Sequence, residues 1–227
     1  MNGRGITLDV NRIPLGCKYV DALLGGGIEA GSVTLFYGEA GCGKSNICMQ
    51  MARNIIQSGK KVAYVDTEGL SYERIMQIFK DEALVKDLLI FQVHSFTEQS
   101  NRVDQIAKIA KTGVLGLIVV DSMTMFYRLN YDNMEMRNDF IRQTEVLLNL
   151  ARDYEVPILI TSQVYTNITT GAIEFLGGHA MHHNAKTIIR LDMRGNGLRN
   201  AVIIKHRSLP EGRSAMFRIT ADGVGDP

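Results

Sequence analysis

The stretch LFYGEAGCGKSNIC, Leu35 to Cys48, decides the fold, because a glycine-rich turn in it joins an apolar strand to an amphipathic helix. Residues 38–45 match G-x-x-x-x-G-K-[ST] in full, and they lie between a predicted strand and a predicted helix, as that motif requires. Glycines let the backbone wrap closely around phosphates, and helix N-termini favour anions. The pattern predicts a nucleoside-triphosphate site. The alternative is a glycine-rich turn that happens to precede a helix, and the full match argues against it.

The residues expected to contact the nucleotide are those of the loop and the first helical turn: Gly38, Glu39, Ala40, Gly41, Cys42, Gly43, Lys44, Ser45 and Asn46. In such loops the lysine reaches the β- and γ-phosphates and the hydroxyl ligates Mg²⁺, which assigns these roles to Lys44 and Ser45. No N-K-x-D segment occurs, so the usual guanine-reading element is absent and we predict ATP.

Around this loop, short apolar strands alternate with amphipathic segments, the pattern of a mainly parallel α/β sheet flanked by helices. The predicted strands are residues 32–37, 60–66, 88–93, 115–121 and 156–163, and the clearest helices are residues 44–58 and 137–154. Residues 185–193, 200–207 and 215–220 are β-rich without intervening helices. We therefore expect an antiparallel or mixed C-terminal extension of the sheet.

The composition limits which partners, metal sites and cellular locations can be expected. The 227 residues carry a net charge of +1, so a site for a polyanion must be a local basic patch. The three cysteines lack metal-type spacing, and the start MNGRGITLDV lacks the apolar core of a signal peptide. The longest apolar run is too short to span a bilayer. We expect one domain over residues 1–227, free thiols, an intracellular location and no membrane partner.

Polar residues at strand ends are the next candidates, because ligands of open α/β sheets bind beyond the carboxyl ends of the strands. Asp121 ends the strand LGLIVVD and is predicted to hold the Mg²⁺ shell, although many such aspartates are only turn residues. Ser122 follows it, so the hydrolytic base must lie elsewhere. Glu68 in YVDTEG is predicted to orient the attacking water, the alternative being that Asp66 and Glu68 merely solvate a strand end.

With the loop, YVDTEG, LIVVDS and ITSQV in this order, the chain resembles the RecA-like recombinases, most closely the archaeal RadA-type branch. The likeness runs from GCKYVDALLGGGIEAG to SLPEGRSAMFRITADGVGD. It implies a RecA-like P-loop ATPase core. The chain begins almost at this core, so we expect it to lack the N-terminal helical DNA-binding domain of longer members. KHRSLPEG resembles the signature segment of a short accessory paralogue in this family.

The resemblance implies further roles, position by position. Glu68 is the catalytic carboxylate, and Gln163 senses the γ-phosphate. Arg74 matches the position that stacks on adenine, and Pro210 the position that caps the other face of the base. Lys205 stands where the recombinase cap has an acidic residue, which suggests that its ammonium replaces a bound cation.

The resemblance also implies two DNA-binding loops, which correspond to residues 127–139 and 164–186. The first offers phosphate contacts and aromatic stacking surfaces, whereas the second is poor in charge. The cationic candidates are Arg128, Arg137, Lys186, Lys205 and Arg207, beside the tyrosines Tyr127 and Tyr131. This thin basic content predicts modest, salt-sensitive affinity. His179, His182 and His183 lack a nearby cysteine or acid, so we expect them to contact phosphate or water rather than a metal ion.

Three functions remain open from these observations. The first is an ATP-binding accessory protein of DNA repair and recombination in the archaeal cytoplasm, with weak hydrolysis and no strand exchange of its own. Such a protein would regulate a RadA-type recombinase or a Holliday-junction resolvase. The second is an active DNA-dependent recombinase ATPase, and the third is a RecA-like signalling ATPase that does not touch DNA.

Overall fold

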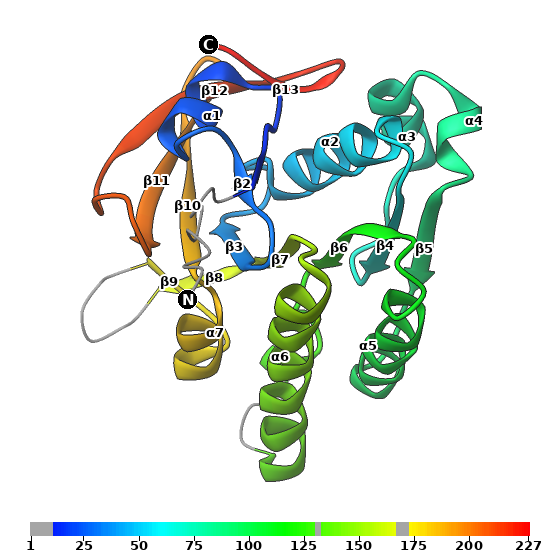
Figure 1. Ribbon diagram of the computed structural model, residues 1–227. Coiled ribbons are helices and arrows are strands. Elements are labelled where there is room, and N and C mark those ends of the chain that lie inside the picture. Colours follow the sequence, from blue (N-terminus) through cyan, green and yellow to red (C-terminus); the bar gives the residue numbers. More distant parts are fainter. Residues whose placement is uncertain (1–10, 130–132, 167–172) are drawn as a thin grey trace, which may run out of the picture.

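The apolar runs of the sequence form one large mixed sheet. The computed structural model describes residues 11–129, 133–166 and 173–227, and within them nine strands pair in the order β13–β12–β11–β10–β3–β7–β6–β4–β5 (Figure 1). The strands on the parallel side are β3 (Val33–Gly38), β4 (Lys61–Asp66), β5 (Leu88–Gln92), β6 (Leu115–Asp121), β7 (Ile158–Ser162) and β10 (Thr187–Arg194). The antiparallel extension consists of β11 (Leu198–His206), β12 (Ser214–Thr220) and β13 (Gly223–Gly225). The predicted α/β fold and its C-terminal extension are confirmed.

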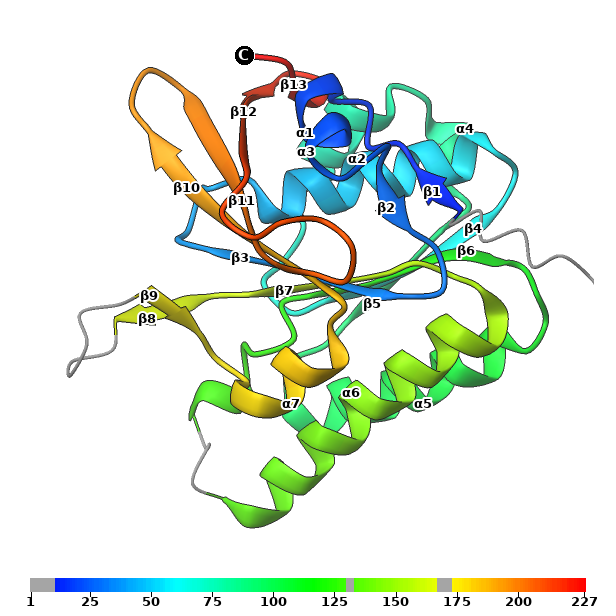
Figure 2. The same ribbon diagram turned by 60° about the vertical axis from the view of Figure 1, so that its left-hand side comes forward.

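Helices cover both faces of the sheet, as Figures 1 and 2 show. One face packs against α1 (Lys18–Leu23), α2 (Lys44–Gln57), α3 (Tyr72–Phe79) and α4 (Glu82–Val85). The other face packs against α5 (Phe96–Ala110), α6 (Met134–Tyr154) and α7 (Gly178–Asn184). Successive strand residues alternate between the faces: Leu35 lies in one core cluster and Phe36 in the other. Burial on both faces explains why these strands read as continuous apolar runs.

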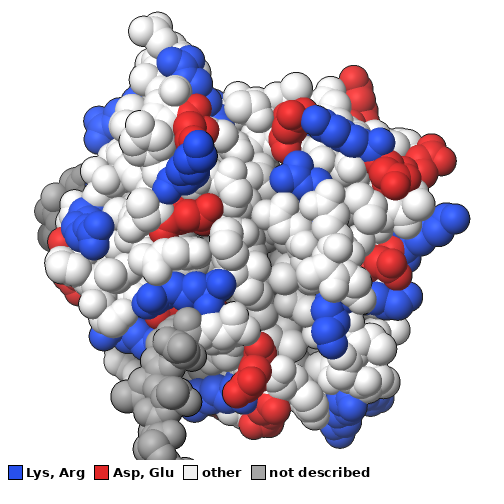
Figure 3. Space-filling view, turned by 45° about the horizontal axis from the view of Figure 1, so that its top comes forward, with Lys and Arg blue, Asp and Glu red and all other residues white. Residues whose placement is uncertain are grey.

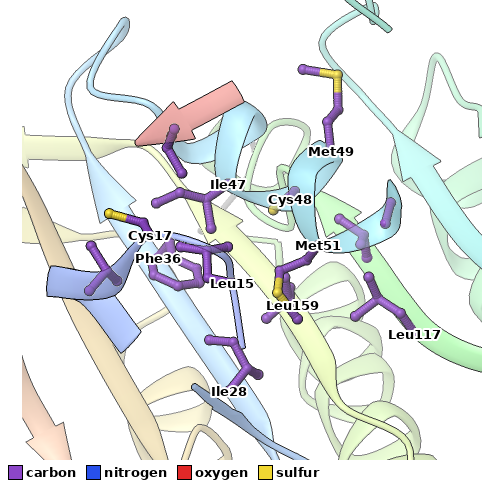
Figure 4. Packing of buried hydrophobic residues seen from close by; sticks show 14 of the residues in the cluster. Leu15, Cys17, Ile28, Phe36, Ile47, Cys48, Met49, Met51, Leu117 and Leu159 are labelled. Carbon is purple, nitrogen blue, oxygen red and sulfur yellow. The ribbon is translucent and has the colours of Figure 1, made fainter. Parts of the chain in front are cut away.

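Helix α2 follows the phosphate loop and lies across the sheet (Figure 4). Its residues Ile47, Met51 and Ile55, at helical spacing, are buried, and Met51 packs near Leu159 of β7. Each fully buried aliphatic side chain of this kind contributes about 1.5–3 kcal/mol. The packing therefore fixes the N-terminus of α2 at the carboxyl end of β3.

Several helices begin at a residue whose side chain accepts a backbone N–H. Ser71 caps α3, Ser95 caps α5 and Asn133 caps α6. Helix α6 begins at Met134, before the predicted start at residue 137, because Asn133 provides this cap and accepts from the amide of Met136.

The remaining elements are short. β1 (Arg12–Ile13) pairs with β2 (Ile28–Glu29), β8 (Val164–Thr166) pairs with β9 (Ile173–Phe175), and a 3₁₀ turn, η1, spans Tyr127–Leu129. The sequence did not predict the β8–β9 ribbon, which leaves the sheet directly after β7. No helix in the described ranges is long and apolar enough to cross a membrane.

Candidate functional site

The phosphate loop is shaped by close backbone packing at two glycines. A Cβ on Gly38 would collide with the carbonyl oxygen of Leu191 in the neighbouring strand β10. Gly43 has a φ of 109°, and a Cβ there would lie 3.3 Å from the ring of Phe217. The clash requires glycine at position 38, and the φ favours glycine at position 43, since L side chains rarely adopt it.

The first turn of α2 fits a bound phosphate. Its N-cap is Gly43, which makes no side-chain cap hydrogen bond, and the first turn holds no acidic residue. The first amides of this helix thus point out of the helix end without a side-chain acceptor, unlike those of α3, α5 and α6. Helix-terminal amides of this kind bind phosphate oxygens. Ser45 and Asn46 lie in this turn and are partly exposed.

Lys44 is almost fully buried against the loop. Its ammonium donates to the carbonyl oxygens of Gly38 at 2.9 Å and Glu39 at 3.0 Å. Cys42 contacts the same ammonium, and burial raises the pKa of its thiol despite the cation. The lysine is therefore held within the loop. A bound phosphate oxygen would replace these carbonyl oxygens as the acceptor of its hydrogen bonds. The expected free thiols are all buried, and burial raises the pKa of Cys17 to about 11.

Asp121 lies buried at the end of β6, between the two strands that flank it in the sheet. Tyr64 of β4 donates to its Oδ2 at 2.7 Å, and Thr161 of β7 donates to its Oδ1 at 2.5 Å. Burial, and then the Asp121 charge, raise the pKa of Tyr64 well above its ordinary value, so the phenol stays a donor. Both donors are neutral hydroxyls, which orient the carboxylate oxygens without pairing them with a cation.

Glu68 sits on a turn that Asp66 organises. The carboxylate of buried Asp66 accepts from the backbone amides of Glu68, Gly69 and Leu70 at 3.2, 2.8 and 2.7 Å. Thr67 joins this turn to the end of β6, because its hydroxyl donates to the carbonyl oxygen of Ser122. The exposed carboxylate of Glu68 is thus carried on a rigid turn.

Gln163 links Glu68 to the first predicted DNA loop. Its side-chain nitrogen donates to Glu68 Oε1 at 2.9 Å, while its side-chain oxygen accepts from the guanidinium of Arg128. The structure thus brings together two residues predicted to serve hydrolysis and one predicted to serve DNA binding.

Arg74 is held beside the start of α2. Its guanidinium donates to Asn46 Oδ1 at 2.6 and 2.8 Å and to the carbonyl oxygens of Thr220 and Ala221. Pro210 lies exposed in the turn after β11, whose last residue, His206, pairs with the start of β10, whereas Gly38 pairs with Leu191 further along β10. The structure therefore anchors Arg74 next to the phosphate loop but does not bring Pro210 to it.

A cavity of about 1070 Å³ opens between η1, α6, α7 and the β8–β9 ribbon. Arg128, Arg137, Tyr127 and Tyr165 line it, together with His179 and His183 of α7. Tyr131 and residues 167–172 of the second loop lie outside the described residues. Within the described ranges no group of three or more His, Cys, Asp or Glu side chains could hold a metal ion.

The other cationic candidates have structural partners. The Lys205 ammonium donates to the carbonyl oxygens of His182 and Ala185 at the end of α7, and burial lowers its pKa. Arg207 forms an ion pair with buried Glu29 at 2.6 Å. Among the described residues, the Lys186 ammonium makes only a 3.4 Å bond, to the carbonyl oxygen of His183. On the face drawn in Figure 3, Lys and Arg are interspersed with Asp and Glu, without a continuous basic patch.

Sequence reasoning did not identify four residues that shape this site. Tyr64 and Thr161 lie inside apolar strands, where the alternating pattern predicts only that their side chains pack in the core. The sequence indicates for Asp66 only a role in solvating a strand end. Arg199 of β11 donates to the Gly41 carbonyl oxygen at 3.2 Å, a contact that depends on the antiparallel extension folding back beside the loop.

Comparison with known proteins agrees with the motifs. The family model described as Rad51 matches residues 7–227. A protein of Methanococcoides burtonii named DNA repair and recombination protein RadB is 45% identical, over 92% of this chain and 95% of the relative. One of the same name from Archaeoglobus fulgidus is 40% identical, over 93% and 97% of the two chains. A solved structure titled "Crystal structure of the RadB recombinase" superposes with a TM-score of 0.84 at 35% identity, covering 94% of this chain and 98% of that one. The predicted RecA-like core and the resemblance to RadB, the short paralogue of RadA, are confirmed.

Proposed function

Because this chain belongs to the Rad51 family, we propose that it acts in DNA repair and recombination, the processes in the names of its relatives, and that it binds ATP with Mg²⁺ to do so. The observation that carries the proposal is the convergence of the uncapped α2 N-terminus, buried Asp121 and the Glu68–Gln163 pair at one edge of the sheet. Proteins that hydrolyse nucleotides need these groups together, because binding, metal coordination and water activation must act on one phosphate chain.

The residues divide the work as follows. The amides of residues 43–46 and the ammonium of Lys44 hold the phosphates, and Arg74 offers a planar cation to the base. Mg²⁺, held by Ser45 and through Asp121, would neutralise charge on the β- and γ-phosphates. Glu68 accepts a hydrogen bond from the attacking water and lines it up with the γ-phosphorus.

We propose weak hydrolysis, because Glu68 and Gln163 are bonded to each other rather than free for water and phosphate. The accessory role follows from the resemblance: the chain would control a DNA-bound state of a RadA-type recombinase, or cleavage by a Holliday-junction resolvase, without strand exchange of its own. An active DNA-dependent recombinase and a signalling ATPase without DNA are the alternative functions. That residues 1–227 form a single domain stays a prediction.

The test measures ATP binding and the hydrolysis rate with and without single-stranded DNA. Lys44→Ala should abolish nucleotide binding, and Glu68→Gln should keep binding but lose turnover. Lys86→Ala, which removes an exposed lysine at the end of α4, is the control and should match the wild type.

Retained ATP affinity in Lys44→Ala would contradict the site. A large stimulation by DNA would favour the active recombinase, and no DNA binding at low salt would favour the signalling ATPase.

A further inference from the structure

The antiparallel extension contacts the phosphate loop through two side chains that share one ladder position. Arg199 of β11 and Phe217 of β12 lie directly opposite each other, so their side chains point to the same face of the sheet. The Nε of Arg199 donates to the carbonyl oxygen of Gly41 at 3.2 Å, and the ring of Phe217 lies beside Gly43. Two residues of the C-terminal strands therefore contact the loop on either side of Cys42.

Gly41 has little support from the loop itself. The residue is exposed, its φ is 78°, and a Cβ added to it would have no atom within 4 Å. A glycine in open space can rotate its peptide plane at low cost, because no side chain restricts it. Among the described residues, Arg199 provides the hydrogen bond that the Gly41 carbonyl oxygen accepts. This bond restrains a peptide that the loop would otherwise leave free to rotate.

The direction of that carbonyl group decides the direction of the next amide. The peptide between Gly41 and Cys42 is trans, so an oxygen that faces Arg199 turns the N–H of Cys42 the opposite way. This N–H donates at 3.3 Å to the carbonyl oxygen of Glu39, the same oxygen that the Lys44 ammonium contacts at 3.0 Å. The amide and the ammonium thus face the same point inside the loop, where a phosphate oxygen would replace the carbonyl.

Arg199 also brings a charge without a carboxylate partner. Its guanidinium donates to Gly41 and to the carbonyl oxygen of Leu198 at 3.2 Å, and it forms no ion pair within the described residues. An unpaired cation beside a phosphate loop attracts anions by its charge alone. Orientation of the peptide and attraction by the charge are therefore two separate effects, and the experiment must distinguish them.

We propose that Arg199 is a positioning residue of the nucleotide site, which holds the peptide between Gly41 and Cys42 in the direction that phosphate binding uses. The inference rests on the proposed function for its effect on nucleotide affinity. It gives the antiparallel extension a role in phosphate binding, because the restraint comes from β11 and not from the strand and helix that flank the loop. A restraint on the empty loop should change how tightly nucleotide binds, and not how fast bound nucleotide is hydrolysed.

Two measurements on the full chain test the inference, the first on nucleotide affinity. Arg199→Met removes the donors and the charge but keeps an unbranched side chain in their place. Calorimetric titration should show ATP and ADP both binding about five- to tenfold more weakly, as expected for loss of one hydrogen bond from a charged donor at a partly exposed position. The kcat should stay within about twofold of the wild type. Arg199→Lys should recover part of the affinity, because an ammonium can still donate to the carbonyl oxygen.

Arg218→Met is the matched control. Arg218 is an exposed arginine of β12, next to Phe217 in the chain, so its side chain points to the opposite face of the sheet. It donates at 3.5 Å to the carbonyl oxygen of Asn196 and not to the loop. This variant should bind both nucleotides as the wild type does. If Arg199→Met weakened ATP much more than ADP, attraction by charge would explain the effect, because ATP is the more negative ligand, and the inference would be overturned.

The second measurement uses Cys42 as a reporter in the nucleotide-free protein. Its thiol is buried, as are those of Cys17 before α1 and Cys48 in α2. Without the restraint the loop should open more often, so Arg199→Met should raise the alkylation rate of Cys42 about five- to tenfold. The rates at Cys17 and Cys48, measured on their own peptides by mass spectrometry, should stay unchanged. Arg218→Met should leave all three rates unchanged.

The outcomes that would overturn the inference follow from these two measurements. An unchanged alkylation rate of Cys42 in Arg199→Met would do so, and so would unchanged affinity for both nucleotides. An equal rise at Cys17 and Cys48 would show a general loss of stability in place of a local restraint, and would overturn it as well. Failure of the wild type to bind nucleotide would instead refute the proposed function, and the Cys42 rates would still decide the inference.

Discussion

At the scale of the residue, Asp121 shows how neutral donors orient a buried carboxylate. Tyr64 and Thr161 approach it from the strands on either side, and each donates one hydrogen bond. A lysine or arginine in their place would neutralise the carboxylate and weaken its attraction for a cation. Neutral hydroxyl donors orient the group without pairing it with a cation.

Tyr64→Phe tests this arrangement, because it removes the donor and keeps the buried ring. We expect about a tenfold higher Mg²⁺ concentration for half-maximal ATP hydrolysis, as for other partners of metal-binding carboxylates. We also expect a loss of about 1–3 kcal/mol in the free energy of unfolding, because one oxygen of Asp121 loses its partner. Mg²⁺ titration and urea unfolding measure the two effects. Tyr19→Phe, at an exposed position, should change neither. An unchanged Mg²⁺ requirement in Tyr64→Phe would show that Tyr64 does not support the metal site.

Single residues were predictable where a motif fixes their chemistry. The loop of residues 38–45 and Asp121 can be recognised in the sequence, because phosphate and Mg²⁺ require specific residue types at specific spacing. The contact of Arg128 with Gln163 could not be predicted, since it depends on which strand ends lie side by side. Strand order comes from crossovers that no local pattern encodes.

At the scale of the element, the turn between β11 and β12 is built around one histidine. The Nδ1 atom of His206 accepts from the backbone amides of Ser208 and Leu209, both at 3.1 Å. The Nε2 atom faces Glu29 at 3.9 Å, and the side chain is only 1% exposed. This histidine therefore shapes the turn that carries Pro210, the predicted base cap.

The lowered pKa of His206 makes the stability of the folded chain depend on pH. Burial is the main cause of its lowered pKa; the charge of Glu29 opposes the shift, and Arg12 and Arg207 add to it. A histidine whose pKa is lower in the folded than in the unfolded chain binds fewer protons when folded. Stability is then greatest above the ordinary value of 6.5 and falls as the pH drops from 6.5 toward the folded pKa. Protonation of Nδ1 would also remove the acceptor that both amides use.

His206→Asn should remove this dependence. We expect the thermal midpoint of the wild type to fall between pH 7 and pH 5 by more than that of the variant, which should be less stable than the wild type at pH 7 by about 1–2 kcal/mol. Differential scanning calorimetry over this range measures both. His94→Asn, at an exposed histidine, is the control and should follow the wild type. Parallel pH curves for wild type and His206→Asn would exclude His206 as the source.

Elements with long apolar periodicity were correctly predicted, including the five central strands and α2. The β8–β9 ribbon was not, because its strands are three residues each and gain their order from packing of Phe175 on Tyr37 at 5.1 Å. Short strands carry too little pattern to be recognised, and tertiary contacts decide them.

At the scale of the whole molecule, charge is nearly balanced and mixed in sign over the face drawn in Figure 3. Of the five predicted cationic contacts to DNA, Lys205 and Arg207 already serve α7 and Glu29. Arg128, Arg137 and Lys186 remain as candidates. A protein with so few phosphate contacts should bind DNA with the modest, salt-sensitive affinity predicted from the sequence, and the slope of that salt dependence should reflect about three contacts.

The salt dependence can be measured directly. For three phosphate contacts to a single strand, the logarithm of the binding constant should fall with the logarithm of salt concentration with a slope of about −2. Arg137→Ala should make this slope shallower by about 0.7. Lys111→Ala, at the exposed end of α5 just before β6, should leave it unchanged. Fluorescence anisotropy at several salt concentrations gives these slopes, and a wild-type slope beyond about −4 would mean that a different surface binds the DNA.

The position of β3 in the sheet also governs when the phosphate loop can form during synthesis. β3 ends at Gly38, yet its two neighbours are β7, which begins at Ile158, and β10, which begins at Thr187. At about 5–20 residues per second, the ribosome needs several seconds or more to add these partners. Until then β3 has no strand to pair with on either side. The loop at its end acquires its shape only after β7 and β10 have been made, so a nascent chain that ends before Ile158 should not capture nucleotide.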